Sequence, residues 1–391
     1  KPKIHRTVQE VLDFTGITPD GIIIAGNNYS KLYHLIDSNF VTEPEDKQWE
    51  SLTNYTKLIN RFPDYMDISI VIINERNTTS DIIESYHLPL QGDEYDKYRI
   101  DYNNIIDKKI EEGHNEISKE KYIMLTVRAK DLHDAEMEFN AADITLNEAV
   151  KAINKVGVKQ LDAIERLTIM QKILCGTERI PFHKEYARFF ETHKDEDGNE
   201  TVTFNLKKLK RSGMSVKDLI APQTIIRSHQ SLQLDENRYC KSFALANLPQ
   251  QLDTIFLTNV PYEMVTVIQF KPVPRKKALN FVKMQNTSIK ADVIKASQQA
   301  YRSGYDPSLM SEDLIQAREE AAKLRNDVVN EGKKLFFTTM VVTIFGRSEE
   351  DLKQITAQYT AKCADYSVTP SYLIGQQIAG LNTAILCNTS K

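Results

Sequence analysis

Residues 335–345 read Leu-Phe-Phe-Thr-Thr-Met-Val-Val-Thr-Ile-Phe, and β-branched or aromatic side chains fill most of these positions. Such a run is typical of a buried strand. The strand is expected to end at Gly346, and Ser348 then offers its hydroxyl to the free amides at the start of a helix. Acidic residues follow at positions 349–351, where the helix dipole favours negative charge. The stretch therefore predicts a strand, a turn and a helix in succession.

A second copy of this unit lies earlier in the chain. Tyr122–Val127 reads Tyr-Ile-Met-Leu-Thr-Val and leads through three residues into a helix that Asp131 is expected to cap. One core strand and its returning helix have thus been used twice. This duplication bears on architecture and says nothing about chemistry.

Other elements can be placed around these two units. Two apolar runs, Gly21–Ala25 and Tyr29–Ile36, flank a Gly-Asn-Asn turn and predict a hairpin. Residues 43–62 have apolar side chains at helical spacing and predict a helix. Asp67–Ile73 predicts a second buried strand, and a long polar stretch of helical character follows it to about Ser118.

The second half of the chain repeats the order of the first. Tyr239–Leu245 matches Tyr29–Leu35 as Tyr-x-Lys-x-aromatic-x-Leu, and Tyr239 follows Tyr29 by 210 residues (239 − 29). The ending Ile-Leu-Cys occurs twice as well, with Cys387 following Cys175 by 212 residues (387 − 175). The strand at 263–270 matches the one at 67–73 with a smaller offset of 196 (263 − 67), which requires connections of different length. Each match is weak alone, but the shared order indicates an internal repeat.

This repeat predicts an α+β protein of two similar domains, each a small mixed sheet covered by helices in the manner of a ferredoxin-like fold. The expected domains are residues 1–176 and residues 236–391. Between them, residues 177–235 are expected to form a linker with a projecting charged hairpin, because His193–Glu200 is a charged turn between apolar flanks.

Composition limits the classes of function. The chain has 391 residues, a length that suits two domains. Its 50 basic and 54 acidic side chains give a net charge of −4, so no protein-wide field attracts nucleic acid or anionic lipid. The four cysteines lie far apart, a pattern that favours free thiols in a reducing cytoplasm. No apolar run is long enough for a membrane span, so a cytoplasmic protein is expected.

The sequence lacks the common motifs for catalysis and cofactor binding. The sequence has no Gly-x-x-x-x-Gly-Lys-Ser/Thr phosphate loop, no His-Glu-x-x-His and no Gly-x-Ser-x-Gly. Cys175 and His183 are close enough in sequence to meet, yet neither belongs to a ligand-spaced pair, which favours structural roles. We therefore expect no catalytic, cofactor-binding or metal-binding residue in this chain.

Two basic runs are the candidate contacts with a partner. The first comprises Lys207, Lys208, Lys210 and Arg211, and the second comprises Arg275, Lys276 and Lys277. Charge runs without interleaved aromatic residues are usually solvated faces, which is the alternative interpretation of both.

With this order of elements, the chain resembles the amino-terminal region of the TrbE/CagE-type (VirB family) ATPases of conjugation and type IV secretion, and within them the Gram-positive conjugal-transfer branch. Three pieces carry the resemblance, namely Thr18–Ile24 with Tyr29–Leu35, Tyr239–Pro249, and Gln376–Ala384. In such proteins this region precedes a RecA-like motor domain that holds ATP and Mg²⁺, and the present chain stops at Lys391 before any such domain. The family's nucleotide-binding residues therefore have no counterpart here.

The resemblance implies a non-catalytic docking and assembly region on the cytoplasmic face of the cell membrane. Its expected partners are type IV secretion channel and inner-membrane proteins, together with other copies of the full-length protein, without direct contact to nucleic acid. Two alternatives remain open on the residues alone. One is an enzyme with a site between the two halves, because clefts between domains are common sites. The other is a DNA-binding module that uses the basic runs.

Overall fold

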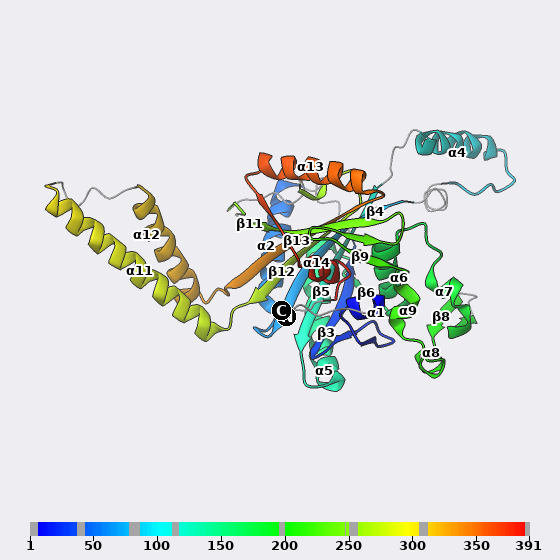
Figure 1. Cartoon of the computed structure of the whole chain (residues 1–391), viewed down its shortest axis with the longest axis horizontal. Coiled ribbons are helices and arrows are strands. Elements are labelled where there is room, and N and C mark those ends of the chain that lie inside the picture. Colours follow the sequence, from blue (N-terminus) through cyan, green and yellow to red (C-terminus); the bar gives the residue numbers. More distant parts are fainter. Residues whose placement is uncertain are drawn as a thin grey trace.

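The structure is a computed structural model that describes residues 7–36, 44–77, 87–111, 117–194, 200–246, 248–249, 257–304 and 312–387. A long sheet runs through the body of the molecule, and helices cover both of its faces (Figure 1). Two helical excursions project from the body, one on each side of it in this view.

The prediction of two separate small sheets was wrong, because their neighbouring edge strands pair. The sheet has 12 strands, and its six central strands lie in the order β3-β5-β4-β12-β13-β11. These are β3 (Asn28–Leu35), β5 (Ile117–Arg128), β4 (Met66–Arg76), β12 (Met264–Pro272), β13 (Phe336–Gly346) and β11 (Tyr239–Ala246). The β4–β12 pair joins the halves over seven antiparallel residue pairs, from Ile68↔Phe270 to Asn74↔Met264. The protein is therefore α+β with one large antiparallel sheet.

The strand order is the same on both sides of this junction. Moving outward, β4-β5-β3 on one side corresponds to β12-β13-β11 on the other. Each strand corresponds to the one with which it was matched in the internal repeat of the sequence. Val71 pairs with Val267, which lies 196 residues later (267 − 71) and is its own counterpart in the repeat. A local two-fold axis thus passes through the Val71–Val267 pair.

Shorter strands extend the sheet at both ends. On the first side they are β1 (Gly16–Ile17), β2 (Ile23–Ala25) and β6 (Val158–Gln160), and on the second side they are β9 (Ile225–Arg227), β10 (Leu232–Leu234) and β14 (Thr369–Tyr372). β6 pairs with β3 and β14 pairs with β11, again in equivalent places. The repeat therefore extends to these edges.

Helices cover the two faces in a matching way. On one face, α2 (Glu45–Arg61) and α5 (Leu132–Asn154) cover the first half, and α13 (Glu349–Asp365) covers the second. On the other face lie α6 (Ala163–Cys175) and α14 (Gln377–Ala384). The short helix α9 (Val216–Ile220) joins this second face. The side chain of Asn382 in α14 donates to the carbonyl of Val11, the last residue of the short helix α1 (Val8–Val11).

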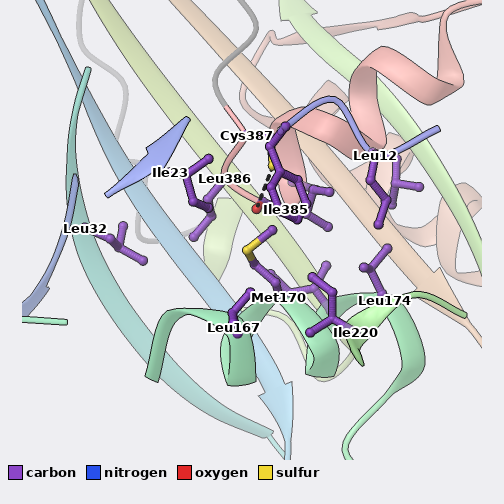
Figure 2. Packing of buried hydrophobic residues seen from close by; sticks show 14 of the residues in the cluster. Leu12, Ile23, Leu32, Leu167, Met170, Leu174, Ile220, Ile385, Leu386 and Cys387 are labelled. Atoms are coloured by element: carbon purple, nitrogen blue, oxygen red, sulfur yellow. Dashed lines mark hydrogen bonds between the residues drawn. The ribbon is translucent and has the colours of Figure 1, made fainter. Parts of the chain in front are cut away.

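One buried cluster on the second face is built from both halves. Leu167, Met170 and Leu174 of α6 pack with Ile385 and Leu386, which follow α14 (Figure 2). Strand residues from each side of the junction, including Val71 and Val267, belong to the same cluster. The two halves thus share a core as well as a sheet.

The middle segment contributes to that shared core. α7 (Phe182–Glu185), the 3-10 turn Ala187–Phe189 and α8 (Leu206–Arg211) bury Phe182, Phe189 and Leu209 in it. A hairpin of β7 (Phe190–Lys194) and β8 (Glu200–Phe204) forms the separate two-stranded sheet. The tip of the expected charged turn, residues 195–199, lies outside the described residues.

The excursions leave the sheet at equivalent connections. Between β4 and β5 the chain forms α4 (Asp96–Glu111), and between β12 and β13 it forms α11 (Arg275–Arg302), α12 (Glu312–Arg325) and the π-helical turn Asn326–Asn330. Residues 78–86 of the helical stretch expected from the sequence lie outside the described residues. Within the described ranges, no helix combines the length and the apolar character that crossing a membrane requires.

Candidate interaction surfaces

The described residues of the α11–α12 arm are anchored to one another at its base. Val273, Ala278 and Val282 pack there with Val328 in a small buried cluster. α11 has 28 residues and is about 42 Å long, so most of it extends beyond this cluster. Met284, Ile294 and Tyr301 on it are 72%, 57% and 77% exposed. Large apolar side chains thus reach solvent along α11.

A groove runs between the two helices of the arm. It has a volume of about 580 Å³, and Ile289 and Val293 of α11 and Ala321 of α12 line it. The cationic residues Lys290, Arg318 and Arg325 also line it. Three asparagines complete the lining, namely Asn286, Asn326 and Asn330. The groove therefore combines apolar, amide and cationic side chains, and it lies outside the body of the protein.

α4 presents a second apolar surface. Tyr95, just before the helix, and Tyr98, Tyr102 and Ile105 within it are 57%, 61%, 40% and 55% exposed. Their spacing of three, four and three residues places them in one stripe along the helix. Where side-chain burial is described, no residue of α4 is buried. We call Tyr95, Tyr98, Tyr102 and Ile105 the α4 seam.

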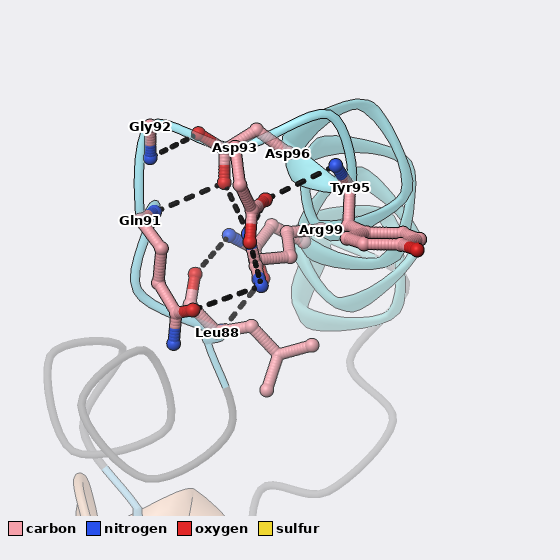
Figure 3. A network of polar contacts seen from close by, with 8 residues as sticks. Leu88, Gln91, Gly92, Asp93, Tyr95, Asp96 and Arg99 are labelled. Carbon is pink, nitrogen blue, oxygen red and sulfur yellow. Dashed lines mark hydrogen bonds and ion pairs between the residues drawn. The ribbon is translucent and has the colours of Figure 1, made fainter.

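The start of α4 is fixed by local polar contacts (Figure 3). The guanidinium of Arg99 donates to the carboxylates of Asp93 and Asp96, and to Gln91 Oε1 at 3.1 Å. Asp96 also accepts from the amides of Gln91 and Gly92, at 3.0 and 2.7 Å. The hydrogen bond from Arg99 lowers the pKa of Asp93, whereas for Asp96 the Gln91 amide is the main cause of a lowered pKa. These contacts stabilise the helix end without covering the α4 seam.

A cleft of about 620 Å³ lies where the two halves and the middle segment meet, next to the ends of β4 and β12. Arg238 lines this cleft and makes several contacts in it. Its guanidinium donates to Glu263 at 2.7 Å and to the Ile173 carbonyl at 3.0 Å, and it lies 4.5 Å from the centre of the Phe345 ring. The contacts of Arg238 thus connect α6 with Glu263, just before β12, and with β13. The positive charge of Arg238 is paired with the carboxylate of Glu263 inside the protein.

Cys175 also lines this cleft. Its thiol donates to the Ile220 carbonyl at 3.5 Å, and burial raises its pKa to about 11. A thiol of that pKa is protonated at neutral pH and is a poor nucleophile. His183 packs edge-on against Phe182 and Phe190, and burial is the main cause of its lowered pKa. Among the described residues, no group of three or more His, Cys, Asp or Glu side chains is placed to hold a metal ion.

The two basic runs are not brought together. Lys207, Lys208, Lys210 and Arg211 are exposed on α8, next to the β7–β8 hairpin. Arg275, Lys276 and Lys277 are exposed in the first turn of α11, at the base of the arm and on the other side of the body (Figure 1). The structure thus provides two separate basic patches.

Neither the groove nor the α4 seam was predicted from the sequence. The groove depends on how α12 folds back on α11, for which no local pattern exists. The α4 seam had a visible signal, because 95, 98, 102 and 105 follow the spacing of a coiled-coil stripe. Many charged residues around it made the stretch read as a solvated helix.

No protein-family model matches the chain, and no curated protein matches it at a significant level.

Proposed function

We propose that this chain is an interaction and assembly module, and specifically the non-catalytic docking region of a conjugation or type IV secretion ATPase. The observation that carries the proposal is the pair of excursions, α4 and the α11–α12 arm, which leave equivalent places in the sheet and expose apolar side chains to solvent. Large exposed apolar patches mark interaction sites in soluble proteins. The resemblance to the ATPase family supplies the biological setting.

In this role the large sheet is a rigid platform and the excursions make the contacts. The expected partners are channel and inner-membrane proteins on the cytoplasmic side, and other copies of the full-length protein. ATP and Mg²⁺ belong to the motor domain that follows this region in the family, so calorimetry on the purified chain should detect no saturable ATP binding.

The test is interference with DNA transfer. Excess of this chain, produced in a donor cell whose conjugative element uses the full-length protein, should occupy the docking sites and lower the transfer frequency at least tenfold. The double variant Met284→Glu, Tyr301→Glu removes two apolar contacts of the arm and should restore transfer. The control is Met137→Glu, Ile144→Glu on the outer face of α5, where the side chains are 63% and 65% exposed. Undiminished transfer with excess wild-type chain, or equal interference by the arm variant, contradicts the proposal.

A further inference from the structure

The α4 seam has the geometry of a helix that is missing its partner. Spacings of three and four residues bring Tyr95, Tyr98, Tyr102 and Ile105 onto one face, as in the a and d positions of a coiled coil. A helix bound in a groove uses anchors with this spacing. None of the four buried clusters in the described parts of the chain includes an α4 residue. The α4 seam is thus left without a packing partner in the described parts of the chain.

The groove of the arm fits such a helix. Its apolar lining, Ile289, Val293 and Ala321, suits the apolar parts of tyrosine and isoleucine. Lys290 and Arg318, which also line it, suit the faces of tyrosine rings, which attract cations. The α4 seam spans residues 95–105 and the α11 side of the groove spans residues 286–294, so each is about two to three helical turns long.

The charges of the two elements are complementary. The two helices that form the groove, α11 and α12, together carry ten lysines or arginines and five aspartates or glutamates. The segment that contains α4, residues 87–111, carries six acidic and four basic side chains. Asp101, which is exposed, lies one turn from Ile105 in the α4 seam. Opposite net charge on two facing surfaces aids encounter and fixes orientation.

These two surfaces cannot meet within one chain, because the body of the protein separates them (Figure 1). We propose that the α4 seam of one copy docks into the α11–α12 groove of a second copy. The contact is head-to-tail, so a dimer keeps one unoccupied α4 seam and one unoccupied groove. Further copies can bind there, and the assembly can grow to a ring or a filament. This inference rests on the assembly role proposed above and names a second copy as the partner of these surfaces.

Self-association of the purified chain tests the contact separately from DNA transfer. Sedimentation velocity over a concentration series should show the wild-type chain forming dimers and larger species. Ile105→Glu disrupts the seam and Ile294→Glu disrupts the groove, and both side chains are exposed, so folding should persist. Each variant alone should weaken association at least tenfold. The control Ile144→Glu makes the same change on the outer face of α5 and should associate like the wild type.

Mixing the two variants gives the decisive result. A seam-defective copy still has an intact groove, and a groove-defective copy still has an intact seam. An equimolar mixture should therefore form dimers with one intact junction and nothing larger. A wild-type chain that remains monomeric throughout overturns the inference and leaves the transfer experiment to judge the proposed function. Variants that associate like the wild type, or a mixture that stays monomeric, also overturn it.

Discussion

Arg166 is the largest fully buried side chain of the described residues, and its partners are backbone carbonyls and a hydroxyl instead of a carboxylate. It donates to the carbonyls of Gly21 at 2.8 Å and Leu386 at 3.1 Å, and to both oxygens of Ser30. Burial lowers its pKa to about 10, so it remains charged at neutral pH. One side chain of α6 thereby joins the hairpin near the start of the chain to the segment after α14.

Two threonines on adjacent central strands differ in hydrogen bonding. The Thr266 hydroxyl has no hydrogen-bond partner among the described residues, whereas Thr343 Oγ1 lies 2.8 Å from Ser242 Oγ, and both threonines are fully buried. Thr266→Val should therefore raise the free energy of unfolding by about 1 kcal/mol, because it removes a buried group without a partner. Thr343→Val should lower it by about 1–2 kcal/mol, because it leaves Ser242 unpaired. Urea denaturation measures both, and equal effects would refute this distinction.

The buried Cys240 thiol makes the folded state less stable as the pH rises above 9. Burial raises the pKa of Cys240 to about 12 from 9.0, so above pH 9 the folded chain keeps the thiol proton that the unfolded chain loses. The stability that comes from burying the neutral thiol is complete below pH 9 and is lost as the pH rises through 12. Between pH 9 and 11, the wild type should lose stability faster than Cys240→Ala by about 1 kcal/mol per pH unit. Denaturation curves at several pH values give the comparison, and parallel losses would argue against it.

At the scale of elements, the sequence predicted strands better than it predicted their neighbours. β13 was expected at 335–345 and occurs at Phe336–Gly346, because β-branched and aromatic residues favour extended backbone locally. The β4–β12 pairing was missed because it involves strands that are distant in sequence. A physical signal existed, since Ile68–Ile73 is almost continuously apolar and lacks the charges that protect a free edge.

The basic patches and the groove also show that local sequence patterns predict exposure but not tertiary packing. Both basic runs are exposed, as a local charge pattern predicts, but the groove needs α12 to return along α11. Tertiary packing created the surfaces on which the functional proposal rests, and single-sequence patterns do not encode it directly.

The close contact of α14 with β11 leads to an element-scale prediction. A Cβ atom at Gly380 would lie 2.3 Å from the Ser242 Cβ atom. The Gln377 side chain accepts a hydrogen bond from the Ser242 amide at 2.8 Å and donates one to the Ser242 carbonyl at 2.9 Å. Gly380→Ala should push the helix off the strand and lower stability by about 1–3 kcal/mol. The control is Gly16→Ala, since a Cβ atom there meets nothing within 4 Å. Thermal unfolding compares them, and a fully stable Gly380→Ala protein would contradict the packing described.

At the scale of the whole molecule, the shared sheet and the shared cluster make the halves one folding unit. Ile385 of the second half is fully buried against first-half residues, so Ile385→Ala should cost about 2–5 kcal/mol. Hydrogen exchange should show the slowest amides of β5 and of β13 losing protection equally. Ile144→Ala, at an exposed site, should change neither. Loss of protection confined to one half would show that the halves unfold independently.

Val71 faces its own counterpart, Val267, across the central pair of strands. A strand that pairs with a copy of itself about a two-fold axis is what holds a symmetric homodimer together. The chain thus has the form of a symmetric dimer within one polypeptide, and its two halves differ in that one carries α4 and the other the longer arm. Two identical halves would carry identical tips, so the directional growth proposed for this protein depends on the difference between them.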